Sequence, residues 1–444
     1  MERIINRRVF FQIAGAGVAG CFVSPIDLLA QTGLEYRPPA MLLNTAKNVI
    51  FILLAGAPSQ TDTFDLKVGP WTPQDYKPAT INGIDFPEGL MPGIASQLGR
   101  IAIVRSCLSS ALVHSLLQTW TQIARSPTSA TGKIAPNMGS IVALEFEAKR
   151  TVGQKLPTFV ALNSTGSLVR QGYLPGRFSP FDVTAGNNGL ANLAHADGED
   201  TFTGRYALLQ ALETGGIRRS DFDEMQYFYS SARLMMNDPA VTAAFRSTGP
   251  ERQRYGNSAF GNSCVVARNL VSANLGTRYI QITLGGWDNH QNIYTPNSGI
   301  YPPARQLDAG LANLISDLAA MPAANGTTRL DETLIVVKGE FGRTVGGLTE
   351  LQGRDHYFVH SALFAGGGVR GGLVLGETSA DGAYVTLGGW SEDRPVTTED
   401  VAATIYSAIG IDYTTIRRDD PLRRGFEYIP STNAWPAYPI RELF

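Results

Sequence analysis

The stretch 333–344, which reads Thr-Leu-Ile-Val-Val-Lys-Gly-Glu-Phe-Gly-Arg-Thr, constrains the fold more than any other part of the chain. Its apolar run stops at Gly339, and a carboxylate, Glu340, follows at once. A short, continuously apolar run is typical of a strand buried on both faces, as in a parallel sheet. The segment 353–360 follows closely and holds two of the five histidines. A buried strand followed by acids and histidines predicts a site at the carboxyl edge of an open α/β sheet.

The same alternation of apolar runs and helical segments continues through the chain. Four further strands are expected, at 47–55, 101–106, 156–162 and 277–284. Helices are expected at 93–99, 116–124, 136–147, 221–245 with a break at Pro239, 263–274, 305–321 and 397–409. Strands that alternate with helices predict an α/β fold with a doubly wound, mostly parallel sheet flanked by helices. We expect one domain over 31–444, with a loop-rich insertion near 163–215 of the kind that often lines substrate sites.

Composition excludes one class of partner and bounds the cysteine chemistry. The formal net charge is -2 and no basic stripe is present, so nucleic acid is not an expected partner. The chain has three cysteines and no Cys-x-x-Cys pair. Cys107 and Cys264 could form a disulfide in an oxidising compartment, but two buried thiols are the favoured interpretation because Cys is among the most buried residue types.

The N-terminus resembles an export signal. Paired arginines and two phenylalanines in 6–12 precede an uncharged, Gly/Ala-rich run at 13–23, which is similar to a twin-arginine signal. The run is too short and too Gly-rich for a transmembrane helix. We therefore expect a signal peptide over 1–30 and a periplasmic or cell-surface protein. Val-Ala-Gly-Cys at 18–21 also resembles a lipobox, so Cys21 is either lipidated, which would be the only membrane anchor, or an incidental residue of the signal.

Polar side chains follow the expected strands in four groups. They are Ser59, Asp62 and Asp65; His114 and Ser115; Asp288 and His290; and Glu340, with Asp355, His356 and His360 just downstream. All carboxyl ends of a parallel sheet lie at one edge, so these groups can converge there. Carboxylate and imidazole ligands suit Zn, Mn or Fe, and a more oxygen-rich set suits Ca or Mg.

Each member of these groups also has an ordinary structural interpretation. Asp62 or Asp65 could cap the next helix, and His114 could be a hydrogen-bonded core histidine. Glu340 could form an ion pair with Arg343. The order of the groups, each after a strand, is more specific than any member taken singly.

Several motifs together resemble the domain of unknown function 1501 family, which is related to sulfatases and the alkaline phosphatase superfamily. They include 56–67 (Gly-Ala-Pro-Ser-Gln-Thr-Asp-Thr-Phe-Asp-Leu-Lys), 286–290 (Gly-Trp-Asp-Asn-His), 339–344 (Gly-Glu-Phe-Gly-Arg-Thr), 353–356 (Gly-Arg-Asp-His) and the Gly-rich 366–376. The resemblance covers nearly everything from about residue 40 onward. It implies an alkaline-phosphatase-like fold and a site with one or two divalent metals, Zn first, with Ca or Mn as alternatives.

Carried onto this chain, the superfamily pattern assigns roles to individual residues. Asp62 becomes the acid of the first strand, and His114 or Ser115 falls near the nucleophile position. The other implied metal ligands are Asp288, His290, Glu340, Asp355 and His356. Phe341 stands where the superfamily has a metal-binding histidine, so the half of the site with Asp288, His290 and His356 is the more intact. The strand at 333–338 is then its scaffold.

These expectations combine into a functional hypothesis. The chain is expected to be an exported, metal-dependent hydrolase of phosphate or sulfate esters, acting on an anionic small molecule or polysaccharide. The metal would polarise the ester and activate Ser115 or a water, while Arg343 or Arg354 holds the anion. The alternative is a degenerate superfamily member that acts as a non-catalytic binding protein of the envelope. Oligomeric state is not predicted.

Overall fold

The computed structural model describes residues 40–164, 166–214, 220–431 and 435–444. Their helices and strands belong to one compact unit, Met41–Phe444. The expected export signal at 1–30, including Cys21, lies outside the described residues. Within the described ranges, no helix combines the length and the apolar character needed to span a membrane.

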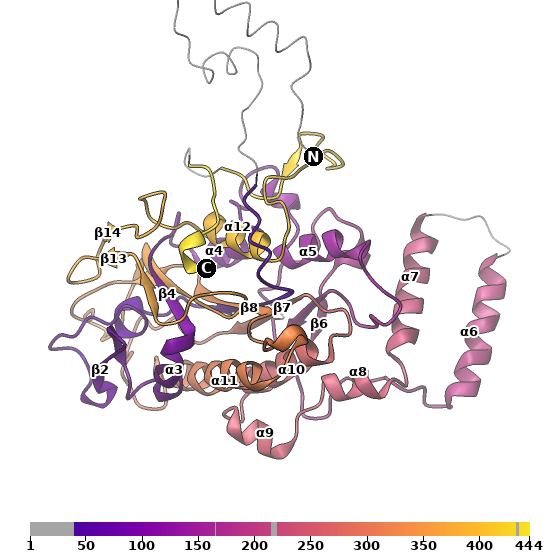
Figure 1. Ribbon diagram of the computed structural model, residues 1–444, viewed down its shortest axis with the longest axis horizontal. Coiled ribbons are helices and arrows are strands. Elements are labelled where there is room, and N and C mark those ends of the chain that lie inside the picture. The colour runs from indigo at the N-terminus through magenta and orange to yellow at the C-terminus, as the bar shows by residue number, and fades with distance from the viewer. Residues whose placement is uncertain (1–39, 165, 215–219, 432–434) are drawn as a thin grey trace, which may run out of the picture. The chain divides into compact units, whose positions relative to one another are not determined.

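An eight-stranded sheet forms the centre of this unit (Figure 1). In spatial order its strands are β12 (Leu373–Leu375), β4 (Ile101–Leu108), β11 (Val359–Ala365), β8 (Thr333–Gly339), β1 (Asn48–Leu54), β7 (Tyr279–Leu284), β5 (Phe159–Leu162) and β6 (Phe181–Val183). Neighbouring strands are parallel except where β11 pairs with β4 and with β8. The predicted α/β fold with a mostly parallel sheet is confirmed.

The two strands that carry the strongest apolar runs, β1 and β8, lie side by side in the middle of the sheet. All seven residues of each are buried, as expected for strands covered on both faces. Leu54 is in register with Gly339 of β8 and with Leu284 of β7. The carboxyl ends of these three strands therefore lie at one edge, where the loops that follow them meet.

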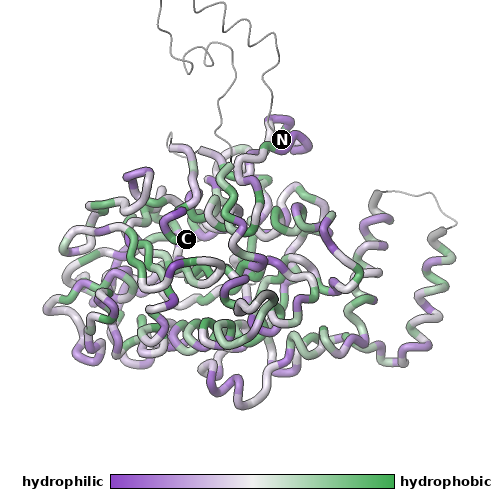
Figure 2. The backbone as a smooth tube through the Cα atoms, viewed as in Figure 1, coloured by the Kyte–Doolittle hydropathy of each residue, from purple (hydrophilic) through white to green (hydrophobic). Residues whose placement is uncertain are grey.

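Helices cover both faces of the sheet (Figure 1). One face carries α3 (Pro92–Gln97), α10 (Ala259–Ala273) and α11 (Tyr301–Ala320); the other carries α4 (His114–Ile123), α5 (Met138–Glu147) and α12 (Thr398–Ala408). Figure 2 shows hydrophobic residues along the central strands that these helices enclose. On the second face, the Trp120 indole donates a hydrogen bond of 2.6 Å to Glu399, which links α4 to α12.

Shorter elements complete the described chain. Four helices and one hairpin lie between the main elements: α6 (Glu199–Thr214), α7 (Ser220–Met235), α8 (Pro239–Ala244), α9 (Gly249–Arg254) and the β2 (Pro78–Ile81)/β3 (Ile84–Pro87) hairpin. Three small antiparallel pairs follow, β9 (Gly342–Arg343)/β10 (His356–Tyr357), β13 (Glu377–Thr378)/β14 (Val385–Leu387) and β15 (Ile416–Arg417)/β16 (Phe426–Glu427). The expected break at Pro239 separates α7 from α8.

Two parts of the chain differ from expectation. The segment 163–215 is not loop throughout, because β6 extends the sheet edge and residues Glu199–Thr214 form α6. Helix α6 lacks a strong apolar face, and good helix formers such as Ala, Leu, Gln and Glu support it instead. The antiparallel strand β11 also was not predicted, because it follows the site loop directly and no helix precedes it.

The two cysteines of the described chain are free thiols. Cys107 lies on β4 and Cys264 on α10, and both are buried. Burial raises the pKa of the Cys107 thiol to about 12, and it raises the pKa of Cys264 as well. The favoured expectation of two buried thiols is confirmed, and the disulfide is excluded.

Candidate metal centre

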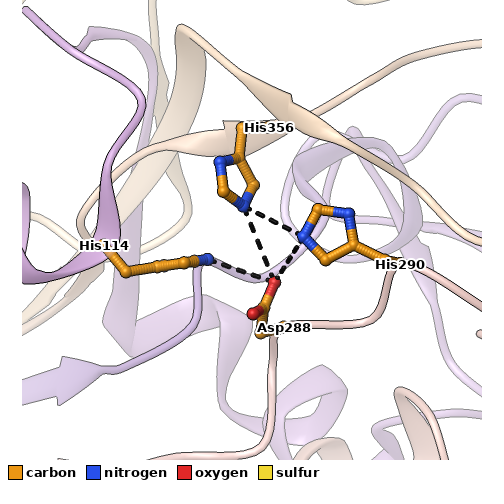
Figure 3. Close-up of side chains that lie close together, drawn as sticks. All are labelled: His114, Asp288, His290 and His356. Atoms are coloured by element: carbon orange, nitrogen blue, oxygen red, sulfur yellow. Dashed lines mark hydrogen bonds and ion pairs between the residues drawn. The ribbon is translucent and has the colours of Figure 1, made fainter.

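Four side chains converge at the carboxyl edge of the sheet: His114, Asp288, His290 and His356 (Figure 3). One ligand atom of each lies within 4.8 Å of those of the others. The Asp288 Oδ1 atom is 3.1 Å from His114 Nε2, 3.0 Å from His290 Nε2 and 3.7 Å from His356 Nε2. The last two Nε2 atoms are 3.1 Å apart. We call these four side chains the histidine–aspartate group.

The four side chains lie in chain segments that follow three separate strands of the sheet. His114 is the first residue of α4, which follows β4, whereas Asp288 and His290 lie in the loop after β7. His356 begins β10, after β8. These strands are far apart in sequence, and the parallel sheet brings their carboxyl ends together.

Two glycines allow the loops to approach closely enough. Gly56, after β1, has a φ of +107°, and a Cβ there would lie 2.7 Å from the backbone nitrogen of Asp288. A Cβ on Gly353 would lie 1.9 Å from the carbonyl carbon of His290. A side chain at either position would force the β7 loop away, so both glycines hold Asp288 and His290 in place.

Each histidine of the group is anchored through its Nδ1 atom. His114 Nδ1 is 2.6 Å from Glu340 Oε1, His290 Nδ1 is 2.7 Å from Asp355 Oδ1, and His356 Nδ1 is 2.8 Å from the Leu112 carbonyl oxygen. An oxygen acceptor at Nδ1 places the proton there and leaves the Nε2 lone pair free. All three Nε2 atoms face the same point, which is the arrangement that metal-binding histidines require.

Glu340 lies behind the group and does not join it. Its carboxylate is fully buried and accepts hydrogen bonds from the backbone nitrogens of Gly56 (2.9 Å) and Ala57 (3.2 Å) and from Gln118 Nε2 (2.9 Å). A carboxylate held by four donors, His114 included, is a rigid anchor for the imidazole. Glu340 was expected to be a metal ligand, but it lies behind the His114 imidazole and contacts its Nδ1 atom.

Asp355 and Asp62 also fall outside the group. Asp355 anchors His290 from the solvent side. Asp62 is buried and receives Arg354 Nε at 2.6 Å and Arg354 Nη2 at 3.2 Å, together with the Tyr294 hydroxyl at 2.7 Å. The Asp62 carboxylate is therefore satisfied by a guanidinium and a phenol, and we leave it out of the ligand set.

Arg343 is a buried support for the loops of the site. Its guanidinium donates to the carbonyl oxygens of Gly56 (2.5 Å), Ala57 (2.9 Å) and Arg354 (3.1 Å), and to Asp288 Oδ1 (2.6 Å). These acceptors take four of its five N–H groups. The expected bidentate grip on a substrate anion would require Arg343 to release these contacts.

The remaining face of Arg343 points at the histidines. Its Nη2 and Nη1 atoms are 3.4 Å from His114 Nε2 and His290 Nε2. Arg354, the other residue expected to hold an anion, is also buried. Its Nη1 atom donates to the Thr344 and Gly346 carbonyl oxygens, and its other N–H groups donate to Asp62 and Tyr294. Both arginines thus act within the protein.

Ser115, expected at the nucleophile position, is exposed at the start of α4. Its carbonyl oxygen accepts a hydrogen bond from the Thr119 hydroxyl. Within the described residues, no hydrogen bond connects the Ser115 hydroxyl to the histidine–aspartate group. The neighbouring residue, His114, joins that group instead.

The charges around the group shift its pKa values in opposite directions. Partial burial would raise the pKa of Asp288, but the Arg343 contact and the charges of the nearby histidines lower it to about 2. Burial alone would lower the pKa of His114, yet Glu340 and Asp288 raise it overall. Burial lowers the pKa of His356. Asp288 is therefore an anion at neutral pH.

Sequence reasoning missed three contributors. Gln118 shares the helix face of His114, because it lies one turn later, and this spacing was an available signal. The Leu112 carbonyl oxygen that anchors His356 carries no sequence signal at all. Phe341 packs its ring 4.7 Å from those of His114 and His356, so it forms an apolar wall of the group.

Fold and site together define a class: an α/β protein whose mostly parallel sheet presents three imidazoles and one carboxylate, suited to a divalent metal, at its carboxyl edge. The sequence matches the family described as protein of unknown function (DUF1501) over residues 46–421, and the chain belongs to that family. No curated protein matches the sequence.

Solved structures show a distant similarity of chain trace. A Vibrio parahaemolyticus protein of the alkaline phosphatase superfamily aligns with a TM-score of 0.39 and 12% identity, over 84% of this chain and 69% of that one. The lipoteichoic acid synthase LtaP from Listeria monocytogenes aligns with a TM-score of 0.39 and 10% identity, over 92% of this chain and 81% of that one. The phosphonate monoester hydrolase SpPMH from Silicibacter pomeroyi aligns with a TM-score of 0.38 and 12% identity, over 89% of this chain and 76% of that one.

Proposed function

We propose that this protein is a metal-dependent hydrolase of phosphate or sulfate esters. The observation that carries the proposal is the convergence of three Nδ1-anchored imidazoles and Asp288 on one point. The ester class rests on the motif resemblance to the sulfatase and alkaline phosphatase superfamily. The group is open to substrate, because the Asp288 and His290 side chains are 47% and 42% exposed.

The donor set fits a transition metal better than calcium. Three nitrogens and one carboxylate suit Zn or Mn, whereas Ca takes oxygen ligands almost exclusively. The side chains that would hold the metal are His114, Asp288, His290 and His356, whose ligand atoms all lie within 4.8 Å of one another. We propose zinc, with manganese as the alternative.

A bound divalent metal would polarise an ester oxygen and lower the pKa of a nearby water. The chain's own residues then have distinct roles. Arg343 fixes Asp288 and adds positive charge beside the anionic substrate, and Glu340 holds His114 in one orientation. We propose water as the nucleophile, because an activated serine requires a hydrogen-bonded base and none of the described residues provides one to the Ser115 hydroxyl.

Metal analysis of the purified protein, followed by a panel of phosphate and sulfate esters, tests the proposal. We expect about one zinc or manganese per chain and metal-dependent turnover. Asp288→Asn and His290→Ala should lose both, while Ser115→Ala should keep turnover. The matched control is His195→Ala, which removes a loop histidine outside the group. Absence of bound metal, with stability unchanged by a chelator, contradicts the proposal.

One observation favours a second candidate, a non-catalytic binding protein of the envelope. Protein acceptors take all five N–H groups of Arg354 and four of those of Arg343. In the described chain, no hydrogen bond joins the Ser115 hydroxyl to the group. Such a protein would bind metal through the same four side chains but turn over no ester. Metal binding without activity across the ester panel would select this candidate.

We also propose export through the twin-arginine pathway, with lipidation of Cys21 as the possible anchor. The paired arginines Arg7 and Arg8 in front of an uncharged run support this proposal. Replacing both arginines with lysine should retain a fusion of the full chain in the cytoplasm. Unchanged export of that variant would contradict the pathway.

A further inference from the structure

A cavity of about 450 Å³ lies where β4 ends, and its wall includes Tyr357, the chain neighbour of the candidate ligand His356. One wall is the end of β4 with Ser109, and another is the turn from β10 into β11, with Tyr357 and Phe358. The third wall is the start of β14, with Tyr384 and Val385. Its size is within the range of pockets that hold small organic ligands.

The chain connects this cavity directly to the histidine–aspartate group. Tyr357 is the residue after His356 in β10. Ser109 donates its backbone N–H to the Phe358 carbonyl oxygen at 3.0 Å and its hydroxyl to the Glu340 carbonyl oxygen at 3.0 Å. The cavity wall and the anchor of His114 are therefore fixed to each other, and a bound ligand would have its position set relative to the metal ligands.

The lining is neutral and aromatic. None of its side chains carries a formal charge at neutral pH, and three are aromatic. Phe358 is 43% exposed although the seven residues of β11 that follow it are buried, and Tyr384 is 62% exposed. Exposed aromatic rings beside a pocket are typical of binding surfaces, because a flat ligand buries them by stacking.

We propose that this cavity holds the organic group of the substrate and that this group is a planar, uncharged aromatic ring. The proposal rests on the proposed hydrolase function and narrows its substrate to aryl esters. A polyanionic polysaccharide does not fit, because the lining offers no cation to its further charges. Phe358 and Tyr384 are then specificity-determining residues that contact the leaving group and not the reacting atoms.

Binding of the ring can be measured without turnover. The probe is 2-naphthol, titrated against wild type, Phe358→Ala, Tyr384→Ala and the control Phe228→Ala, whose ring on α7 is 45% exposed. We expect each pocket variant to weaken binding about fivefold or more, the effect of one aromatic contact, and the control to bind like wild type. The variant His290→Ala should still bind the probe.

Turnover separates this inference from the proposed function. With 4-nitrophenyl and methyl esters of phosphate and sulfate, Phe358→Ala should raise KM for the aryl esters about fivefold and leave the methyl esters unchanged. Probe binding that is sensitive to Phe358 without any turnover supports the cavity and contradicts the hydrolase. Turnover with equal KM for aryl and methyl esters, or binding of dextran sulfate but not of 2-naphthol, overturns the cavity assignment.

Discussion

At the residue scale, the three histidines of the site have the same task but different anchors. His114 is held by a fully buried carboxylate, His290 by an exposed one and His356 by a backbone carbonyl oxygen. An anchored imidazole already has the orientation that metal binding needs, so little side-chain entropy would be lost when a metal binds. Glu340 is the most rigidly held of these anchors, because its carboxylate accepts hydrogen bonds from four donors.

The Glu340 anchor gives the first prediction. Glu340→Gln keeps the size of the side chain but removes the negative charge that orients and polarises His114. Metal affinity should fall about 10- to 100-fold, the usual effect of losing such a partner. Competition with a chromophoric chelator measures it, and the exposed Glu350→Gln is the control. An unchanged affinity would mean that His114 takes no part in metal binding.

At the scale of elements, one carboxylate ties three helices together. Asp317 of α11 accepts hydrogen bonds from Arg254 of α9 (3.1 Å), from the Tyr255 hydroxyl (2.7 Å) and from Arg268 of α10 (2.8 Å). Arg268 is buried, so its charge depends on such partners. These contacts join α9 to α10 and α11, which cover one face of the sheet.

Asp317→Asn should lower the free energy of unfolding by about 2–3 kcal/mol at neutral pH, because Arg268 loses a charged partner. Burial would raise the pKa of Asp317, but the contacts with Arg254, Tyr255 and Arg268 lower it overall. Its contribution is therefore complete above the unfolded pKa of about 3.9 and is lost as pH falls through the lower folded value. Urea unfolding from pH 2 to 7 should show the variant and wild type converging in acid; a constant difference would contradict this.

The start of α12 supports a second prediction at this scale. Thr397 and Asp400 form a capping box, in which each side chain accepts a hydrogen bond from the backbone nitrogen of the other. Thr397→Ala should cost about 1 kcal/mol and Thr397→Ser much less, since serine keeps the oxygen. Chemical unfolding measures both. Equal losses would assign the effect to the threonine methyl group.

At the scale of the whole molecule, the site joins loops from several strands of one sheet. A ligand that binds only the folded chain stabilises it by mass action, by about 2.7 kcal/mol at a hundredfold excess over Kd. A metal held by His114, Asp288, His290 and His356 would therefore stabilise the entire fold and not only one loop.

Added zinc should accordingly raise the midpoint of thermal unfolding, and a chelator should reverse the shift. His356→Ala should abolish the zinc-dependent part while His195→Ala keeps it. Scanning calorimetry at fixed protein concentration is the measurement. A shift that persists in His356→Ala would place zinc elsewhere on the chain.

Sequence patterns predicted the architecture, and they predicted three of the four side chains of the histidine–aspartate group as metal ligands. Continuous apolar runs identified β1, β4, β5, β7 and β8, because strands covered on both faces have no polar side to disguise them. Their order with the helices predicted the parallel sheet, and the sheet predicted that residues after its strands converge. The resemblance to the alkaline phosphatase superfamily, with Phe341 in place of a metal-binding histidine, then indicated Asp288, His290 and His356 as the more intact half of the site.

The loop packing separates the side chains that converge on one point from those that hold them in place. Glu340 and Asp355 contact Nδ1 atoms of the histidines, whereas Asp288 faces the Nε2 atoms. Asp62 is ion-paired with Arg354, which lies far away in sequence. His114 was expected near the nucleophile position and belongs instead to the group. The arginines expected to hold an anion donate to carbonyl oxygens and carboxylates of the protein. Parallel strand directions place the loops after the strands at one edge of the sheet, but ligand geometry depends on distances that the packed loops set.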